Sequence, residues 1–193
     1  MEANHLFPVF FKLEQLQVLV VGGGNVGCEK VNAILQNCPA ARVTVVATWF
    51  LPEMHTIVEG YPNVTLVEKE FSCGDIFGKD LVIAATADKA LNSCIWEKAK
   101  ASKVLINVAD TPALCDFYLG SVVQKGNLKI AISTNGKSPT IAKRLKEVLQ
   151  DAIPDSLENV LHHLNAIRDK LKGDFADKVK KLNELTSVLV ERK

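Results

Sequence analysis

A glycine-rich turn directly after a short apolar run is the feature that most constrains what this chain can fold into. Val18-Leu19-Val20-Val21 leads straight into Gly22-Gly23-Gly24-Asn25-Val26-Gly27, a G-x-G-x-x-G pattern between a predicted strand and a predicted helix. In such a junction Gly22 permits the tight turn, Gly24 lets a pyrophosphate approach the backbone, and Gly27 lets the helix pack closely on the strand. The unpaired N–H groups at the start of the helix then face the phosphates. The pattern favours a dinucleotide-binding turn over a glycine-rich turn without a ligand.

Short β-branched runs alternate with helical stretches around this turn, as in a parallel sheet that is covered on both faces. Strands are predicted at residues 17–21, 42–46, 64–67, 81–85 and 104–108. Helices are predicted at residues 26–37, 51–59 and 89–101, whereas residues 73–79 are too few and too rich in glycine for a long helix. The sequence therefore predicts a Rossmann-like, doubly wound α/β domain over residues 1–113.

The alternation of predicted strands and helices ends after Thr111-Pro112. Residues 117–124 and 128–133 are two β-rich runs joined by Lys125-Gly126-Asn127, which predicts an antiparallel hairpin. A two-stranded hairpin is only marginally stable alone, so it needs the first domain, the following helices or a second subunit to cover it. We expect residues 114–140 to form a dimerisation segment, because a homodimer is the simplest of these solutions.

A helical C-terminal part is predicted for residues 141–193. Ser138 supplies a capping hydroxyl and is followed by a first-turn proline, ahead of an apolar helix face. Asp155, with Glu158 three residues later, predicts the start of a second helix that Gly173 ends, and a last helix follows it.

The composition excludes several classes of protein. With 48% hydrophobic and 23% charged residues, the chain is neither disordered nor collagen-like nor a coiled coil. No apolar run approaches the ~18 residues of a membrane-spanning helix, and the N-terminus lacks a signal-peptide pattern. The five cysteines are scattered and never spaced as C-x-x-C, which argues against a disulfide framework and a zinc site. We expect a cytoplasmic protein with reduced thiols and no membrane partner.

The net charge of +1 hides an asymmetry between the two halves of the chain. Residues 1–113 have a balance of −3 and residues 114–193 a balance of +4. No acid lies between Asp116 and Glu147, whereas six basic residues do: Lys125, Lys129, Lys137, Lys143, Arg144 and Lys146. This basic segment either attracts an anion or is a solvated surface. The charge alone does not separate nucleic acid from a small polyanion.

The end of the second predicted strand bears on the identity of the dinucleotide. An acid usually holds the adenosine ribose there, but the sequence reads Val46-Ala47-Thr48-Trp49. Thr48, backbone groups or Trp49 against the adenine must then recognise the nucleoside. No arginine follows to bind a 2′-phosphate, so we expect NAD rather than NADP.

Polar residues also end the fourth and fifth predicted strands, at the edge where open α/β sheets bind ligands. Thr86 and Asp88 follow the fourth strand, and Asn107 and Asp110 lie at the end of the fifth. Asp88 is better explained as a helix cap than as a catalytic group. Asp110 precedes Thr111-Pro112 and cannot readily begin a helix, so a general base or a substrate anchor is the better interpretation.

A second anion-binding layout follows the predicted hairpin. Ser133, Thr134 and Lys137 belong to a turn that leads into the capped helix. Capping of the helix accounts for Ser138 but not for the other three side chains, which we expect to bind a substrate. No metal site is expected, because His162 and His163 are adjacent on a helix and point in different directions.

The succession of these motifs resembles the precorrin-2 dehydrogenase / sirohydrochlorin ferrochelatase family, which forms the N-terminal module of siroheme synthases. The resemblance spans nearly the whole chain and rests on these segments: Phe7-Pro8-Val9-Phe10, Val20-Val21-Gly22-Gly23-Gly24-Asn25-Val26, Ala84-Ala85-Thr86, Asn107-Val108-Ala109-Asp110, Cys115-Asp116-Phe117, and residues 131–139. Two departures from the family pattern are Asn135 in place of glycine and Gly120 in place of proline.

The resemblance implies a homodimer with exchanged strands and a reaction, the NAD-dependent oxidation of precorrin-2 to sirohydrochlorin. In bifunctional members Fe²⁺ is then inserted as a second substrate. By position, Asn25, Val26, Thr48 and Trp49 match the dinucleotide-contacting loops of the family, and Asp110 matches its catalytic aspartate. A tetrapyrrole with eight carboxylates is a polyanion that the basic segment would attract.

Other interpretations remain open at this stage. A non-catalytic, redox-sensing NAD-binding module would share the glycine turn but would not need Asp110. A nucleic-acid-binding protein would explain the basic segment, but neither the dinucleotide turn nor the negative balance of the first half supports it. Within the family, a dehydrogenase alone and a dehydrogenase with chelatase activity are equally compatible with the sequence.

Overall fold

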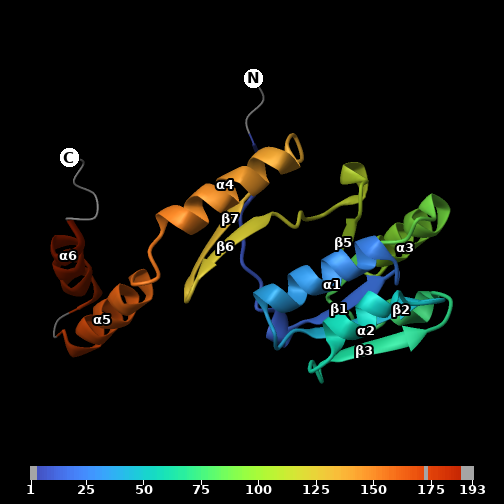
Figure 1. Ribbon diagram of the computed structural model, residues 1–193, viewed down its shortest axis with the longest axis horizontal. Helices are drawn as coiled ribbons and strands as arrows, with labels where there is room; N and C mark the ends of the chain where they lie inside the picture. The colour runs from blue at the N-terminus through green and yellow to red at the C-terminus, as the bar shows by residue number, and fades with distance from the viewer. Residues whose placement is uncertain (1–3, 172–173, 188–193) are drawn as a thin grey trace. The chain divides into compact units, whose positions relative to one another are not determined.

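The computed structural model describes residues 4–171 and 174–187 of the chain. The chain divides into two compact units, His5–Leu119 and the part that begins at Gly120, and each is described by itself (Figure 1). Gly173, which the sequence predicts to end a helix, and residues 188–193 of the predicted helical C-terminal part lie outside the described residues. No helix within the described residues has the length and apolar character needed to cross a membrane.

A five-stranded parallel sheet forms the centre of the first unit. Its strands are β1 (Gln17–Val21), β2 (Arg42–Ala47), β3 (Val64–Glu68), β4 (Leu81–Ala84) and β5 (Leu105–Val108). They lie in the order β3-β2-β1-β4-β5, so the direction of winding reverses between β1 and β4. Ligands of open α/β sheets bind at the carboxyl edge beside such a reversal. The predicted doubly wound sheet is confirmed.

Helices cover both faces of this sheet. The helices are α1 (Asn25–Asn37), α2 (Pro52–Val58) and α3 (Lys89–Ala101), and the 3-10 turns are η1 (Leu13–Gln15), η2 (Cys73–Ile76) and η3 (Pro112–Leu114). The short η2 replaces a helix in the third crossover, as its length and glycine content predict.

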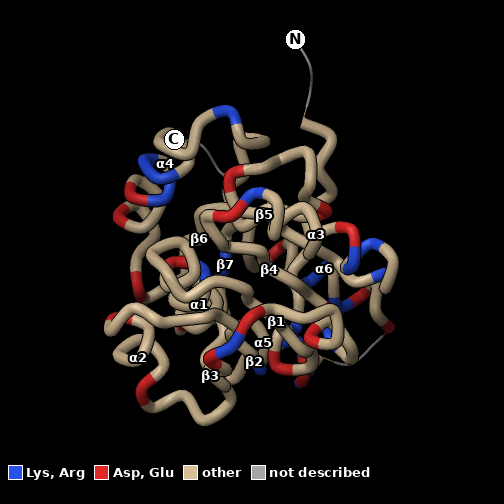
Figure 2. Tube along the Cα trace, turned by 90° about the vertical axis from the view of Figure 1, so that its right-hand side faces the viewer, with Lys and Arg blue, Asp and Glu red and all other residues tan. Residues whose placement is uncertain are grey.

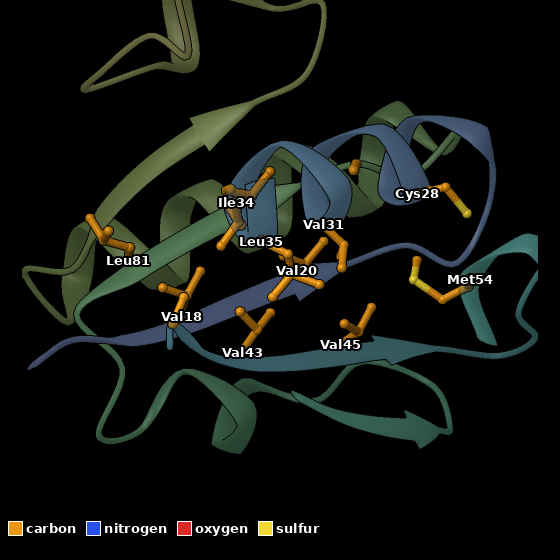
Figure 3. Close-up of a cluster of buried hydrophobic side chains, with 13 residues drawn as sticks. Val18, Val20, Cys28, Val31, Ile34, Leu35, Val43, Val45, Met54 and Leu81 are labelled. Atoms are coloured by element: carbon orange, nitrogen blue, oxygen red, sulfur yellow. The ribbon is translucent and has the colours of Figure 1, made fainter. Parts of the chain in front are cut away.

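The core consists of two apolar layers, one on each face. Val18 and Val20 of β1 face α1, whose Val31 packs against them in a cluster that Figure 3 shows between the helix and the sheet. Leu19 and Val21 face the opposite side, where α3 and η2 cover them. Because side chains alternate along a strand, a strand buried on both faces must be apolar throughout. Each such buried side chain contributes about 1.5–3 kcal/mol of transfer free energy.

The second unit contains a hairpin and three helices. Its elements are β6 (Ser121–Lys125), β7 (Leu128–Ile132), α4 (Pro139–Ala152), α5 (Leu157–Lys170) and α6 (Phe175–Thr186). β6 and β7 pair antiparallel with Lys125 opposite Leu128, which confirms the hairpin. The Ser138 hydroxyl accepts the Ile141 N–H at 3.2 Å, which confirms the predicted cap of α4.

Two local predictions are wrong. The first hairpin strand begins at Ser121 rather than at residue 117, because the Phe117 carbonyl accepts a hydrogen bond from Asn107 of the first unit. Asp155 and Glu158 do not cap α5, whose first flanking residue is Ser156. Their carboxylates bind the hairpin turn instead. Asp155 pairs with Lys125 at 2.6 Å, and Glu158 accepts the Asn127 N–H at 2.7 Å.

A polar cluster stabilises the crossover at η2. The Asp75 carboxylate accepts hydrogen bonds from Lys69 Nζ at 2.5 Å, from Ser72 N at 2.8 Å and from Ser72 Oγ at 3.2 Å. Burial raises the pKa of Asp75, but these hydrogen bonds outweigh burial and leave the pKa below its ordinary value of 3.8.

Asp75→Asn should lower the free energy of unfolding at pH 7 by about 1 to 2 kcal/mol, because the variant loses a charged acceptor. A depressed pKa stabilises the fold above the pKa of the unfolded state, and the contribution disappears as the pH falls through the folded value. Urea unfolding between pH 7 and pH 3 should show the difference from the parent shrinking. Glu70→Gln, at an exposed neighbouring position, is the control. A pH-independent difference would contradict the role of the charge.

Candidate functional site

Close backbone contacts hold the glycine turn at the end of β1. Gly22 has a φ of +129°, and its N–H donates to the Val46 carbonyl at 2.9 Å. A Cβ at Gly22 would lie 2.3 Å from the Ala85 carbonyl oxygen, and one at Gly27 would lie 2.0 Å from the Gly22 carbonyl oxygen. Both distances are far below van der Waals contact. Glycine is therefore required at these positions for the turn to join β1, β4 and α1.

Gly24 differs from its neighbours because the protein leaves the space beyond it open. A Cβ there would meet only Trp49 Cη2, at 3.8 Å, within a 4 Å radius, and its φ of −85° suits any residue. As the residue before α1, Gly24 has no side chain to satisfy the first N–H groups of the helix. These N–H groups belong to Asn25 and Val26, the first two residues of α1. Open space and hydrogen-bond donors thus occur together beside Gly24, and the residues present fit the phosphates of a dinucleotide.

Thr48 and Trp49 follow β2 and lie beside this turn. A Cβ at Gly23 would lie 2.1 Å from the Trp49 carbonyl oxygen, while the Trp49 side chain is 55% exposed. Lys69, whose N–H donates to the Ala47 carbonyl, has its ammonium group paired with Asp75. Thr48 and Trp49 remain the predicted ligands of the nucleoside.

Thr86 and Asp88, which follow β4, are engaged within the fold. The Asp88 carboxylate accepts the N–H groups of Ala90 at 2.8 Å and Leu91 at 3.1 Å, so Asp88 is the cap of α3. Thr86 Oγ1 donates to Asn92 Oδ1 at 2.7 Å, and Asn92 Nδ2 donates to the Thr86 carbonyl at 3.0 Å. The buried Asn92 amide therefore holds the turn after β4. A contact of Thr86 with the dinucleotide stays a prediction.

Asp110 lies just beyond β5, at the same carboxyl edge of the sheet. Its φ of +57° is a backbone conformation that residues other than glycine rarely adopt. The side chain is exposed, and its carboxylate forms no hydrogen bond or ion pair with any residue that the structure describes. A free carboxylate at this edge can accept a proton from a bound ligand.

Asn107 is buried and serves the fold. Its Nδ2 donates to the Phe117 carbonyl at 2.8 Å and reaches Cys115 Sγ at 3.5 Å. Phe117 is further fixed by an edge-to-face contact with Phe11. A direct contact of Asn107 with a substrate stays a prediction, because its amide donors already bind the chain after β5.

The turn after β7 uses its hydroxyl groups for its own structure. Ser133 Oγ accepts the Asn135 N–H at 3.2 Å, and Thr134 Oγ1 accepts the Ser138 N–H at 3.1 Å. The view that only Ser138 has a structural role in this turn is therefore wrong. The hydroxyl hydrogens of Ser133 and Thr134 are not used in these bonds. Asn135 has a φ of +54°, which asparagine tolerates better than most residues where the family has glycine.

The basic segment is only partly neutralised. Lys125 pairs with Asp155, and Arg144 pairs with Glu147 at 2.9 Å. Three exposed lysines form no ion pair with the described residues: Lys137, Lys143 and Lys146. Figure 2 shows the basic positions along α4. These lysines are the cations that remain available to an anionic ligand.

No protein metal site is apparent in the part of the chain that the structure describes, where no three His, Cys, Asp or Glu side chains gather suitably for an ion. His162 Nε2 lies 3.0 Å from Glu158 Oε1, one turn earlier on α5.

Two residues that follow Asp110 in the chain have structural roles that the sequence did not predict. Cys115, at the end of the loop that carries Asp110, and Asp116, the next residue, hydrogen-bond to the backbone of β5 through their side chains. The only signal for them was the segment Cys115-Asp116-Phe117, because a thiol and a carboxylate in a loop do not reveal their partners by spacing.

Comparisons with known proteins identify matching family models and a similar fold. The family model described as putative NAD(P)-binding matches residues 9–121, and the model described as sirohaem biosynthesis protein central matches residues 125–152. A solved structure described as SirC, precorrin-2 dehydrogenase is similar with a TM-score of 0.73 and 27% identity, and the match covers 93% of this chain and 89% of that one.

Curated relatives include longer proteins. The siroheme synthase of Citrobacter koseri is 35% identical over 90% of this chain and 37% of its own length. The siroheme synthase of a Psychrobacter species is 36% identical over 90% of this chain and 34% of its own length. The chain thus spans little more than a third of these relatives.

Gly24→Val should leave the fold intact and weaken dinucleotide binding by at least about 100-fold, because the added side chain fills the space meant for a phosphate. Titration with NAD, followed by tryptophan fluorescence, measures the affinity, and circular dichroism checks the fold. Gly27→Val is the contrasting variant, since its side chain collides with the protein itself and should damage the fold. Unchanged NAD affinity in Gly24→Val would remove the glycine turn from the binding site.

Proposed function

Because the chain belongs to the precorrin-2 dehydrogenase family, whose members include the N-terminal module of siroheme synthases, we propose that it oxidises precorrin-2 to sirohydrochlorin with NAD. One observation carries the proposal. The carboxyl edge of a single sheet presents both an open glycine turn after β1 and a free carboxylate, Asp110, after β5. A dinucleotide site and a base are the two elements that this oxidation requires.

The glycine turn and the residues after β2 would hold the dinucleotide. The N–H groups at the start of α1 bind its phosphates, and Thr48 and Trp49 contact the adenosine. When bound, NAD supplies a nicotinamide ring that accepts a hydride from the substrate. The preference for NAD over NADP is supported by the end of β2, which no arginine directly follows in the sequence, and by the pairing of Lys69 with Asp75.

Asp110 is the proposed general base. Oxidation of precorrin-2 removes a hydride and a proton, and the Asp110 carboxylate takes the proton from the macrocycle. Its exposure and its lack of partners among the described residues leave it ready to do so.

The second unit would contribute to binding of the tetrapyrrole. Its unpaired Lys137, Lys143 and Lys146 attract the carboxylates of the macrocycle, and the hydroxyl hydrogens of Ser133 and Thr134 can donate to them. This distribution also explains why the positive charge concentrates in the second half of the chain.

Insertion of Fe²⁺ is a second candidate step at the same edge. Formation of siroheme releases two protons from pyrrole nitrogen atoms as the metal ion enters; the Asp110 carboxylate would accept one of them, and the other would pass to the solvent to which Asp110 is exposed. Fe²⁺ is then a substrate bound by the macrocycle. An anaerobic assay with precorrin-2 and NAD, followed by Fe²⁺ or Co²⁺, separates the two steps by their spectra. Oxidation without insertion would restrict the protein to the dehydrogenase step.

A cytoplasmic location completes the proposal. All five cysteines are free in the structure, and two of them, Cys73 and Cys94, are exposed. Thiols persist in this state in a reducing compartment.

A homodimer would cover the apolar surface of the second unit. Ile141, Leu145 and Val148 lie one helical turn apart on α4 and are 56%, 45% and 62% exposed. The hairpin beside α4 has two strands and needs cover. A second copy of this segment supplies cover of matching chemistry.

A redox-sensing NAD-binding module is the competing function. It would bind NAD with the same turn but would not turn over precorrin-2. The free Asp110 carboxylate favours the enzyme, because a sensor has no proton to accept.

Asp110→Asn should keep the fold and the NAD affinity while lowering the rate of precorrin-2 oxidation by about 10²- to 10⁴-fold, because the amide cannot act as a base. We expect Fe²⁺ insertion to fall as well, since both steps would use one carboxylate. The measurements are kcat for each step and the Kd for NAD. Oxidation at nearly the parent rate would show that Asp110 is structural. Loss of oxidation alone would assign Asp110 to the redox step.

Val148→Asp should convert the dimer into a monomer of about 21 kDa, because an exposed charge on the apolar face of α4 opposes association. Sedimentation equilibrium at micromolar concentration measures the mass of parent and variant. Phe77→Asp, which adds a charge at a 91% exposed apolar residue of the first unit, is the control. A monomeric, fully active parent protein would rule out the dimer.

A further inference from the structure

The loop that carries Asp110, residues 109–115, is fixed on both sides of this residue. The Ala109 N–H donates to the Ala84 carbonyl at 2.9 Å, and the Thr111 N–H donates to the Val108 carbonyl at 3.2 Å. Asp110 itself has the left-handed φ of +57°. Aspartate adopts this conformation more readily than most residues with a side chain, and the surrounding hydrogen bonds select it over the commoner right-handed conformations.

The thiol of Cys115 is the polar side chain that closes this loop. Its Sγ accepts the Val108 N–H at 3.3 Å and lies 3.5 Å from Asn107 Nδ2. Its S–H can be shared between the carbonyls of Val108 at 3.2 Å and Thr111 at 3.4 Å. Burial raises the pKa of the Cys115 thiol, so the group keeps the proton that it donates. One side chain thus ties the residue after Asp110 to the end of β5.

Asp116 fixes the chain immediately beyond the loop. Its N–H donates to the Ile106 carbonyl at 2.7 Å, and its Oδ2 accepts the Ile106 N–H at 3.1 Å. Its Oδ1 pairs with Lys100 of α3 at 2.6 Å. The segment after the loop therefore has two independent attachments, one to β5 and one to the helix before it.

We propose that Cys115 and Asp116 are positioning residues for the reaction, which act by holding the Asp110 backbone in its left-handed conformation at the sheet edge. The inference rests on the proposed role of Asp110 as the base. Neither side chain needs to touch the substrate. A carboxylate displaced by about 1 Å loses its alignment with the proton that it removes, at a cost of about 100-fold in rate.

A thiol suits this position because it combines a donor, acceptors and bulk. Valine at residue 115 would fill a similar volume but could make none of the hydrogen bonds. Serine would keep a donor and an acceptor on a smaller atom with shorter hydrogen bonds. The two substitutions therefore separate hydrogen bonding from packing.

The test measures kcat and KM for precorrin-2 oxidation and the Kd for NAD in full-length variants. We expect Cys115→Val to lower kcat by about 10- to 100-fold with the Kd for NAD changed less than twofold, and Cys115→Ser to recover most of the rate. Cys94→Val, at an exposed position of α3, is the matched control with parent kinetics. Asp116→Ala should reproduce the kinetic pattern and serves where Cys115→Val fails to fold.

A double-mutant comparison separates positioning from a general structural effect. In an Asp110→Asn background the same Cys115→Val substitution should lower the residual rate by less than threefold, because the group that it positions is already absent. Equal losses in both backgrounds, or a parent-like Cys115→Val and Asp116→Ala, would overturn the inference. If Asp110→Asn alone retains the parent rate, the proposed base is wrong instead, so the two failures are distinguishable.

Discussion

The close approach of Gly27 to the Gly22 carbonyl is the contact on which the first unit depends. With no Cβ between them, the start of α1 lies directly against the end of β1, and Ala85 of β4 approaches Gly22 from the other side. Three elements therefore meet at one point of the carboxyl edge. The open space beyond Gly24 exists because its two neighbours in the motif are packed so tightly.

The segment that follows β5 is the second feature that shapes the candidate site. Two of its side chains form hydrogen bonds with the backbone: Asn107 donates to the Phe117 carbonyl, and Cys115 donates to the Val108 carbonyl and so closes the loop. Asp110 is the exception, since its backbone is fixed while its side chain has no hydrogen-bond or ion-pair partner within residues 4–171 and 174–187. A rigid support and an uncommitted functional group are the combination that an active site requires. The same division recurs in the second unit, where Ser133 and Thr134 shape a turn beside lysines without ion pairs.

The fold was largely predictable because it follows from periodic patterns. The five parallel strands and the helices of the first unit lie within a residue or two of the predicted bounds, since apolar runs and glycine turns report burial directly. The wrong prediction at the start of α5 involves side chains that bind distant partners. Asp155 and Glu158 have the spacing of a cap, yet they bind the hairpin turn some 30 residues away. The roles of Cys115 and Asn92 could not be foreseen for a different reason: their partners are nearby in the sequence, but the geometry of an irregular turn and not residue spacing decides these hydrogen bonds.

The hydrogen bonds of Asp116 with the outer edge of β5 affect whether two copies of this protein can pair through their sheet edges. β5 is an edge strand, and such an edge offers unpaired N–H and C=O groups to a foreign strand. Here the backbone and carboxylate of Asp116 occupy the groups of Ile106, so the edge is partly closed by its own chain. At the opposite edge β3 is short and ends in Glu68, followed by Lys69 and Glu70, charges that resist strand addition. Both edges of the sheet therefore carry features that oppose pairing with a strand of another molecule.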